Sequence, residues 1–274
     1  MKYRTRSIFA ALLFMLLSCF VIRAQERTFQ FEPSETLVYE GEFTRSLLRG
    51  IDVAALQFSA SRLPAPPVDQ IAGPTQPFLL FTAEANSKGI VSKLFGLTFH
   101  QRVESIVEGA TFNVMSTKKV DEQGKRKRTS EAVFDRASNK VTYTEVDPND
   151  PTRTPRVVTS PVTGTVQDIA SAFYYMRTLK LEPGQNFEIS ISDTGQVYRI
   201  PVKVIKREQL KTVIGKVQTV LVEPELFGEG RLIRGNGQIT IWFTDDARHI
   251  PVRAKMNTSL GRVDIKLKSM TNNK

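Results

Sequence analysis

The stretch DIASAFYYMR, residues 168–177, decides the fold. Apolar side chains recur at spacings of three and four from Val166 to Arg177, which is the period of an α-helix with one apolar face. Thr165 or Asp168 has a side chain suited to cap the start of this helix. The sequence therefore predicts one amphipathic helix over residues 166–177.

The rest of the chain shows the two-residue alternation of strands with one buried face. After the helix, IWF at residues 241–243 leads through Asp245-Asp246 to IPVR at residues 250–253, as in a hairpin. Similar segments lie at residues 37–43, 51–58, 78–85, 98–107, 110–120, 131–134, 140–145, 187–191, 198–204, 217–221 and 263–267. We predict an all-β fold: a single large curved antiparallel sheet or open barrel of about a dozen strands. The one helix should pack on its concave face, with Trp242 on the opposite face.

The N-terminus has the pattern of an export signal. Lys2, Arg4 and Arg6 precede an uncharged stretch over residues 7–22, and Ala24 is a small residue suited to cleavage. We expect a signal peptide over residues 1–24 and a single β-rich domain over residues 25–274, in the periplasm or cell envelope and not integral to the membrane after cleavage. An alternative makes Cys19 the acylated residue of a lipoprotein. Cys19 is the only cysteine, so the mature chain would have no disulfide.

The charge balance favours an anionic envelope surface as partner over nucleic acid. The chain has 38 Lys and Arg against 28 Asp and Glu, a formal net charge of +10. Its dense basic cluster is Lys125, Arg126, Lys127 and Arg128. This cluster is a candidate for docking to anionic lipid or acidic polymer, and the alternative is a solvated hairpin tip.

The residues that could carry catalysis form no complete site. Asp193-Thr194-Gly195 is the tripeptide that holds the catalytic aspartate of aspartic proteases, but the chain has no second copy, and a hairpin turn explains it. His100 and His249 are the two histidines, so a zinc site would need both, with Asp245 or Asp246. We expect no enzyme activity, no cofactor and no metal.

Two proline-rich segments, residues 62–77 and 147–161, are expected to be connections, with lids over the sheet as the alternative. A weaker helical pattern covers residues 87–95.

The chain resembles a bacterial family of exported proteins known as domain of unknown function 3108, over residues 35–269. The matching residues are Tyr39-Glu40-Gly41, Asp168, Ser171, Tyr174, Tyr175, Arg177, Gly184, Gly215, Ile241-Trp242-Phe243, Asp245, Pro251-Val252-Arg253 and Gly261. The resemblance implies an exported all-β protein and no catalytic residues. A more distant architectural likeness is to the LolA and LolB type of periplasmic lipoprotein carriers, which hold acyl chains inside a curved sheet.

Three hypotheses for function follow. The first is a non-enzymatic envelope protein that binds a lipid, an acyl chain or another apolar ligand in the concave sheet, in a groove lined by Phe173, Tyr174, Tyr198, Ile200, Ile241 and Phe243. Its plain alternative is that the helix fills this space completely. The second is a structural or assembly factor that engages envelope proteins or anionic surfaces. The third is a hydrolase that uses Asp193 or the pair Asp245 and Asp246.

Overall fold

The computed structural model describes residues 34–46, 48–63, 78–89 and 98–272. The predicted signal peptide, Cys19, most of the first proline-rich segment and residues 90–95 of the weaker helical pattern lie outside the described residues. Within the described ranges, no helix has both the length and the apolar character needed to cross a membrane.

Fifteen strands of the described chain form one sheet in the order β8-β7-β6-β5-β4-β3-β2-β1-β15-β14-β13-β12-β11-β10-β9. The first eight strands are β1 (Glu35–Arg45), β2 (Leu48–Leu63), β3 (Phe78–Ser87), β4 (Phe99–Glu108), β5 (Val114–Gln123), β6 (Arg126–Asp135), β7 (Lys140–Val146) and β8 (Arg156–Pro161). The others are β9 (Val166–Gln167), β10 (Asn186–Asp193), β11 (Gln196–Thr212), β12 (Gly215–Pro224), β13 (Gly237–Thr244), β14 (Pro251–Thr258) and β15 (Gly261–Asn272).

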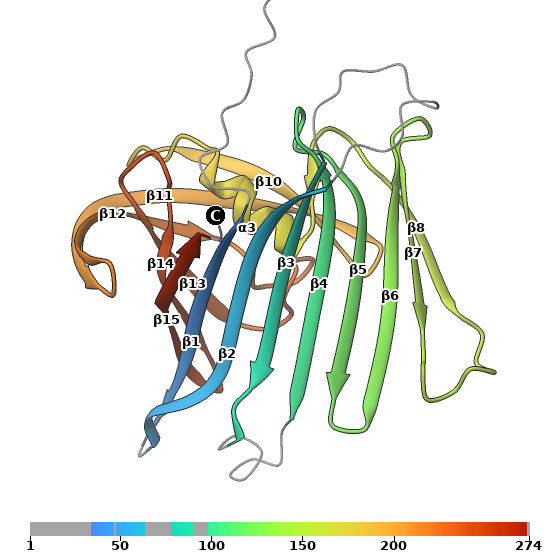
Figure 1. Ribbon diagram of the computed structural model, residues 1–274, viewed down its shortest axis with the longest axis horizontal. Coiled ribbons are helices and arrows are strands. Elements are labelled where there is room, and N and C mark those ends of the chain that lie inside the picture. Colours follow the sequence, from blue (N-terminus) through green and yellow to red (C-terminus); the bar gives the residue numbers. More distant parts are fainter. Residues whose placement is uncertain (1–33, 47, 64–77, 90–97, 273–274) are drawn as a thin grey trace, which may run out of the picture.

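The strand order shows two successive meanders, β1 to β8 and β10 to β15, which join where β1 pairs with β15. The sheet curves so that the two meanders enclose the helix α3 (Ile169–Arg177) between them (Figure 1). In the residues that the structure describes, this arrangement confirms the predicted all-β class and the curved open sheet with a helix on its inner side. Neighbouring strands are antiparallel except β9 and β10, which are parallel.

The helix begins later than the sequence predicts. Asp168 is its N-cap residue, with extended backbone angles, and accepts a hydrogen bond from the backbone N–H of Ser171, whose hydroxyl accepts one from the Asp168 N–H in return. The expected helical start at Val166 is wrong, because Val166 and Gln167 form the short strand β9. The Gln167 side chain donates to the carbonyl oxygen of Phe112, which holds this segment against the sheet.

The second proline-rich segment also differs from the expectation of a connection. Its last six residues form β8, the edge strand of the first meander. An edge strand tolerates the proline at its end, Pro161, because one side of the strand needs no partner in the sheet. The proline content of this segment therefore led to the prediction of a connection where the structure has a strand.

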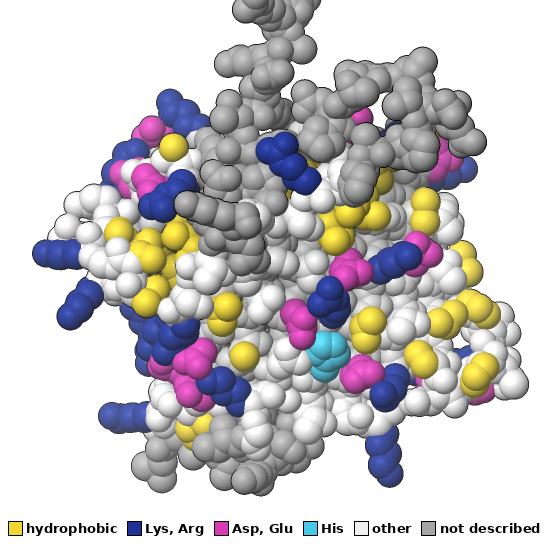
Figure 2. All heavy atoms as spheres, viewed as in Figure 1, with side chains coloured by type: hydrophobic (Ala, Val, Ile, Leu, Met, Phe, Trp, Pro, Cys, Tyr) yellow, Lys and Arg dark blue, Asp and Glu magenta, His cyan; other side chains and the backbone are white. Residues whose placement is uncertain are grey.

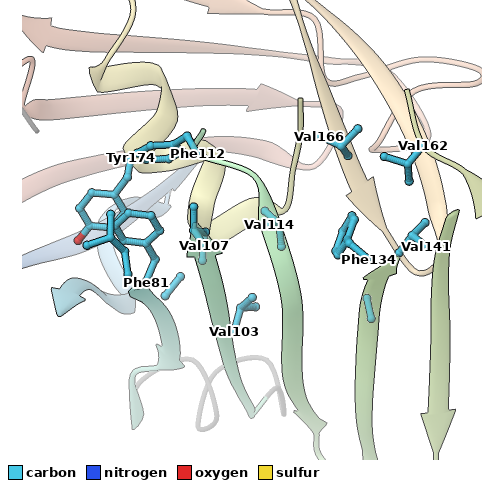
Figure 3. Packing of buried hydrophobic residues seen from close by; sticks show 14 of the residues in the cluster. Phe81, Val103, Val107, Phe112, Val114, Phe134, Val141, Val162, Val166 and Tyr174 are labelled. Atoms are coloured by element: carbon cyan, nitrogen blue, oxygen red, sulfur yellow. The ribbon is translucent and has the colours of Figure 1, made fainter. Parts of the chain in front are cut away.

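One face of α3 is packed solidly against the first meander (Figure 3). The ring of Tyr174 stacks on Phe81 at a centroid distance of 4.3 Å, and Phe81 stacks on Phe112 at 5.5 Å. All three side chains are fully buried. This cluster fixes the position of the helix inside the curved sheet.

The turn between β10 and β11 brings the two ends of the sheet together. Thr194 and Gly195 both have positive φ, 51° and 80°, as a two-residue type I′ hairpin requires. Gly195 lies so close to β7 and β8 that a Cβ atom there would be 2.8 Å from the Cβ atoms of Tyr143 and Val158. The Asp193-Thr194-Gly195 tripeptide is thus a tight turn that brings one end of the open sheet into contact with the other.

Candidate ligand-binding hollow

The helix leaves part of the concave face uncovered. Tyr174 points into the packed cluster, whereas Phe173 and Met176 lie on the side of α3 that faces the second meander and the β1–β2 pair. There the structure has a cavity of about 440 Å³, which we call the hollow. Small-molecule sites in proteins typically measure about 300–1,000 Å³, so the hollow has the size of a binding site.

The lining of the hollow is almost entirely apolar. Among the described residues that line it, all but Tyr39, Asp193 and Arg253 have apolar side chains. The apolar residues are Leu56, Phe58, Ile169, Ala172, Phe173, Met176, Ile189, Ile191, Pro224, Leu226, Leu232, Ile233, Ile239, Ile241, Phe243, Pro251, Ala254 and Ile265. Many of them are only half-buried, and Ile169 is 44% exposed. The hollow therefore presents apolar surface that a ligand could remove from water.

The strand register explains why space remains here. Ala254 on β14 lies opposite Ile241 on β13 and Ile265 on β15, so the three form one row across the inner face of the sheet. Ala172 lines the hollow from the helix. The small side chain of Ala254 leaves space that a larger one would fill, whereas Ala172 also packs with buried residues of the second meander.

Aromatic rings form one wall of the hollow. Phe58 and Phe173 stack at a centroid distance of 3.9 Å, and Tyr39 meets both rings edge-on. The Tyr39 hydroxyl donates to the carbonyl oxygen of Pro251 at 2.8 Å. Burial raises the pKa of Tyr39 above its ordinary value, so this phenol stays protonated and keeps its hydrogen bond.

The hollow has a polar boundary at Asp193. This carboxylate lies 3.7 Å from the ammonium group of Lys119 on β5, and both side chains are about three-quarters buried. Because Asp193 ends β10, the ion pair connects the second meander with the first. The carboxylate of Asp193 is thus paired with a lysine and not with another aspartate.

The predicted groove residues are only partly brought together. Phe173, Ile241 and Phe243 line the hollow. Tyr174 is buried in the cluster with Phe81. Ile200, on β11, is fully buried in the core of the second meander. Neither of these residues lines the hollow. Tyr198 is half-buried, and its hydroxyl donates to Gln196.

Trp242 lies on the opposite face of the sheet from Ile241 and Phe243. Its indole N–H donates to Glu208 at 2.6 Å, and the cationic groups of Arg253 and Lys255 lie over its ring at 5.7 and 5.4 Å. The outer face is charged elsewhere too. Figure 2 shows basic and acidic side chains side by side over the strands that lie at the front of Figure 1.

The basic cluster lies at the β5–β6 hairpin and extends into β6. Three of its members have acidic partners: Arg126 pairs with Asp121, Lys127 with Glu122, and Arg128 with Asp147 and Glu145. The backbone carbonyl of Lys125 accepts a hydrogen bond from Asn149. Local ion pairs therefore offset much of the positive charge of this cluster.

The two histidines form hydrogen bonds, and Asp245 and Asp246 form ion pairs, with other groups of the protein. His100 Nδ1 is 2.7 Å from the Asn86 side-chain oxygen, and His249 Nδ1 is 3.1 Å from the Arg177 carbonyl oxygen. Asp245 pairs with Arg207, and Asp246 with Arg248. In the part of the chain that the structure describes, no group of three or more His, Cys, Asp or Glu side chains could hold a metal ion.

Sequence reasoning missed the part of the lining that comes from the β12–β13 connection. Leu226, Leu232 and Ile233 line the hollow, although Gly228 and Gly230 in the same segment are typical of a plain turn. A backbone bridge between Phe227 and Ile233 gives the connection its shape. The available signal was the presence of apolar residues on both sides of the glycines.

The fold and the hollow define an all-β protein whose open, curved sheet surrounds the helix α3. The chain belongs to the family described as protein of unknown function DUF3108, whose profile matches residues 68–268. This confirms the family resemblance that the sequence indicated.

The fold of this chain is shared by a solved structure. A β-barrel-like protein of the domain of unknown function DUF1849 from Brucella abortus superimposes with a TM-score of 0.57 at 12% identity, over 90% of this chain and all of that one. A protein from Bacteroides fragilis described as exported, with a YmcC-like fold, gives a TM-score of 0.35 at 8% identity, over 88% of this chain and 96% of that one. A protein from Parabacteroides distasonis described as a lipoprotein gives 0.30 at 9% identity, over 90% of this chain and all of that one. The comparison with curated proteins gave no match.

Proposed function

We propose that this protein binds an apolar ligand, a lipid or an acyl chain, in the hollow between α3 and the second meander. The observation that carries this proposal is the coexistence of a packed side and an unfilled side of the same helix. Had the helix only completed a core, a residue as small as Ala254 would not be expected on the sheet side of the remaining gap. The half-buried isoleucines and phenylalanines of the lining provide the surface that a hydrocarbon chain would cover.

The proposal places this binding outside the cytoplasm. The support is the leader pattern of Lys2, Arg4 and Arg6 before an uncharged stretch that ends near Ala24. Fractionation of cells that express the full chain, together with the mass of the released protein, tests this part. Recovery of the intact chain in the cytoplasm would contradict it.

Binding can be tested with a neutral fluorescent probe such as N-phenyl-1-naphthylamine, whose emission rises in apolar sites. Ala254→Phe puts a large ring into the middle of the inner row formed with Ile241 and Ile265. We expect wild-type protein to bind the probe saturably and Ala254→Phe to lose that binding, because the ring occupies the ligand's space.

The matched control is Ala55→Phe. Ala55 follows Ala54 on β2, and it pairs with Glu40 and Asn86, so its side chain belongs to the outer face. Circular dichroism should show that both variants are folded. Equal probe binding by the wild type and Ala254→Phe, with both folded, would refute the hollow as the binding site.

A further inference from the structure

A second, much smaller cavity, which we call the polar chamber, lies beside the hollow. Ile169 and Asp193 line both spaces. Part of the chamber's lining is apolar, from Val103, Ala132 and Phe134. Its polar residues come from β5, β6, β7, β10 and the helix cap: Thr117, Lys119, Ser130, Tyr143, Asp168 and Ser192. An apolar space with polar groups at its boundary is suited to a ligand with one apolar and one polar end.

The size of the polar chamber limits what its occupant can be. Its volume is about 30 Å³. This is room for a water molecule or a single hydroxyl group, but not for a phosphate group or a sugar ring. The polar end of the ligand must therefore be small.

The charges around the chamber limit it further. The carboxylate of Asp168 is 3% exposed and accepts hydrogen bonds from the Ser105 and Thr117 hydroxyls and from the backbone N–H of Ser171. Asp193 is the second carboxylate, and Lys119 is the one cationic residue among the described residues of the lining. Two carboxylates against one ammonium group disfavour an anionic ligand group, because like charges at close range repel strongly where water is excluded.

A hydroxyl group fits these partners in both its roles. It can donate to the carboxylate of Asp193, and it can accept from the ammonium group of Lys119. Ser192, which is 6% exposed, also lines the chamber and adds a small polar group to it.

We infer that the ligand of the hollow is an amphiphile whose hydrocarbon chain ends in an uncharged hydroxyl group, and that the polar chamber binds this hydroxyl and excludes a carboxylate. The inference rests on the proposed function, because it assigns the chemistry and orientation of the ligand in the same hollow. Asp193 is then the residue that selects against fatty acids.

The test compares decan-1-ol with decanoate as competitors of N-phenyl-1-naphthylamine on the full mature chain. Decanol should displace the probe at lower concentration than decanoate. A carboxylate is harder to desolvate than a hydroxyl in any apolar site, so the decisive result is the change in the variant Asp193→Asn. This substitution keeps the shape of the side chain, and we expect it to strengthen decanoate binding about tenfold while decanol binding changes little.

Asp150→Asn is the matched control, since Asp150 lies in the exposed β7–β8 connection and its substitution changes net charge equally. Lys119→Met should have the opposite effect to Asp193→Asn and weaken decanoate further. The inference is overturned if Asp193→Asn, folded by circular dichroism, shifts both competitors alike or neither, or if Asp150→Asn reproduces its effect. If the wild-type protein binds no probe at all, the proposed function fails instead.

Discussion

Removing one partner of the ion pair between Arg177 and Glu35 should strongly destabilise this fold. Arg177 is the last residue of α3 and is 0% exposed, and Glu35, the first residue of β1, is 4% exposed. The guanidinium group donates to both Glu35 carboxylate oxygens and to the carbonyl oxygen of Arg248, and it lies 5.5 Å from the centre of the Tyr174 ring. The pair therefore ties the helix that bounds the hollow to the strand that joins the two meanders.

Glu35→Gln removes the negative charge while keeping the size of the side chain, and leaves the guanidinium group buried. Breaking a buried pair in this way costs about 3–5 kcal/mol. For a protein of this size, that loss lowers the melting temperature by about 6–20 °C. Replacing both partners with apolar residues, Glu35→Leu with Arg177→Met, removes the uncompensated charge, so the double variant should be more stable than either single one.

Urea unfolding followed by circular dichroism measures these differences, and the fluorescence of Trp242, the single tryptophan, gives an independent record. A matched control is Glu188→Gln, because Glu188 pairs with Arg199 at 3.8 Å on the exposed surface and should cost less than about 1 kcal/mol. A loss below about 1 kcal/mol for Glu35→Gln would show that the pair is not buried in the way the structure has it.

Three further predictions concern the closing turn, a buried phenol and the outer face. Gly195→Ala should destabilise the protein by about 2–5 kcal/mol in urea unfolding, since it combines a positive φ with a clash against β7 and β8. Gly184→Ala, with φ of 89° but open space around it, should lose only about 1–2 kcal/mol, and equal losses would contradict the close approach. Burial raises the pKa of Tyr143 to about 12, so its phenol should ionise after ordinary tyrosines in an ultraviolet absorbance titration, and Tyr143→Phe should delete that late component. Because the folded state holds this proton more tightly, the associated stability is complete below pH 10 and is lost as the pH rises to about 12; a phenol that ionises near pH 10 in the folded protein would contradict this. Trp242→Phe should lower stability by about 1 kcal/mol, because it removes the hydrogen bond to Glu208, and a neutral result would show that this bond contributes nothing.

Strand alternation was sufficient to predict most of the sheet. In many of the antiparallel strands one face meets the helix or the core and the other meets water, which gives the sequence a period of two. An example is Val202, Lys203 and Val204, where both valines are buried and the lysine is exposed. The alternation did not predict the strands β8 and β9, which lack this period of two for physical reasons. β8 is an edge strand in a proline-rich segment, and β9 has two residues, whose apolar Val166 fits the helical period equally well.

The candidate site was predictable only in part. Alternation shows that Tyr198 and Ile200 share a strand with buried positions, but not which stretch of the inner face the helix covers. That depends on the direction in which α3 presents Phe173 and Tyr174, and stacking of Tyr174 on Phe81 determines it. Phe81 is 93 residues away along the chain, a separation that no local pattern reveals.

The turn at Thr194 and Gly195 affects how the internal volume of the curved sheet can differ between members of this family. The described strands form no hydrogen-bonded ladder across the place where the ends of the sheet meet, so contacts of one small turn set the circumference there. If hydrogen bonds joined the two ends of the sheet, its circumference could be enlarged there only by inserting a strand. A side-chain contact can instead be shifted by single substitutions at Gly195, Tyr143 or Val158. Relatives with the same strand order can therefore differ in internal volume without any change of topology.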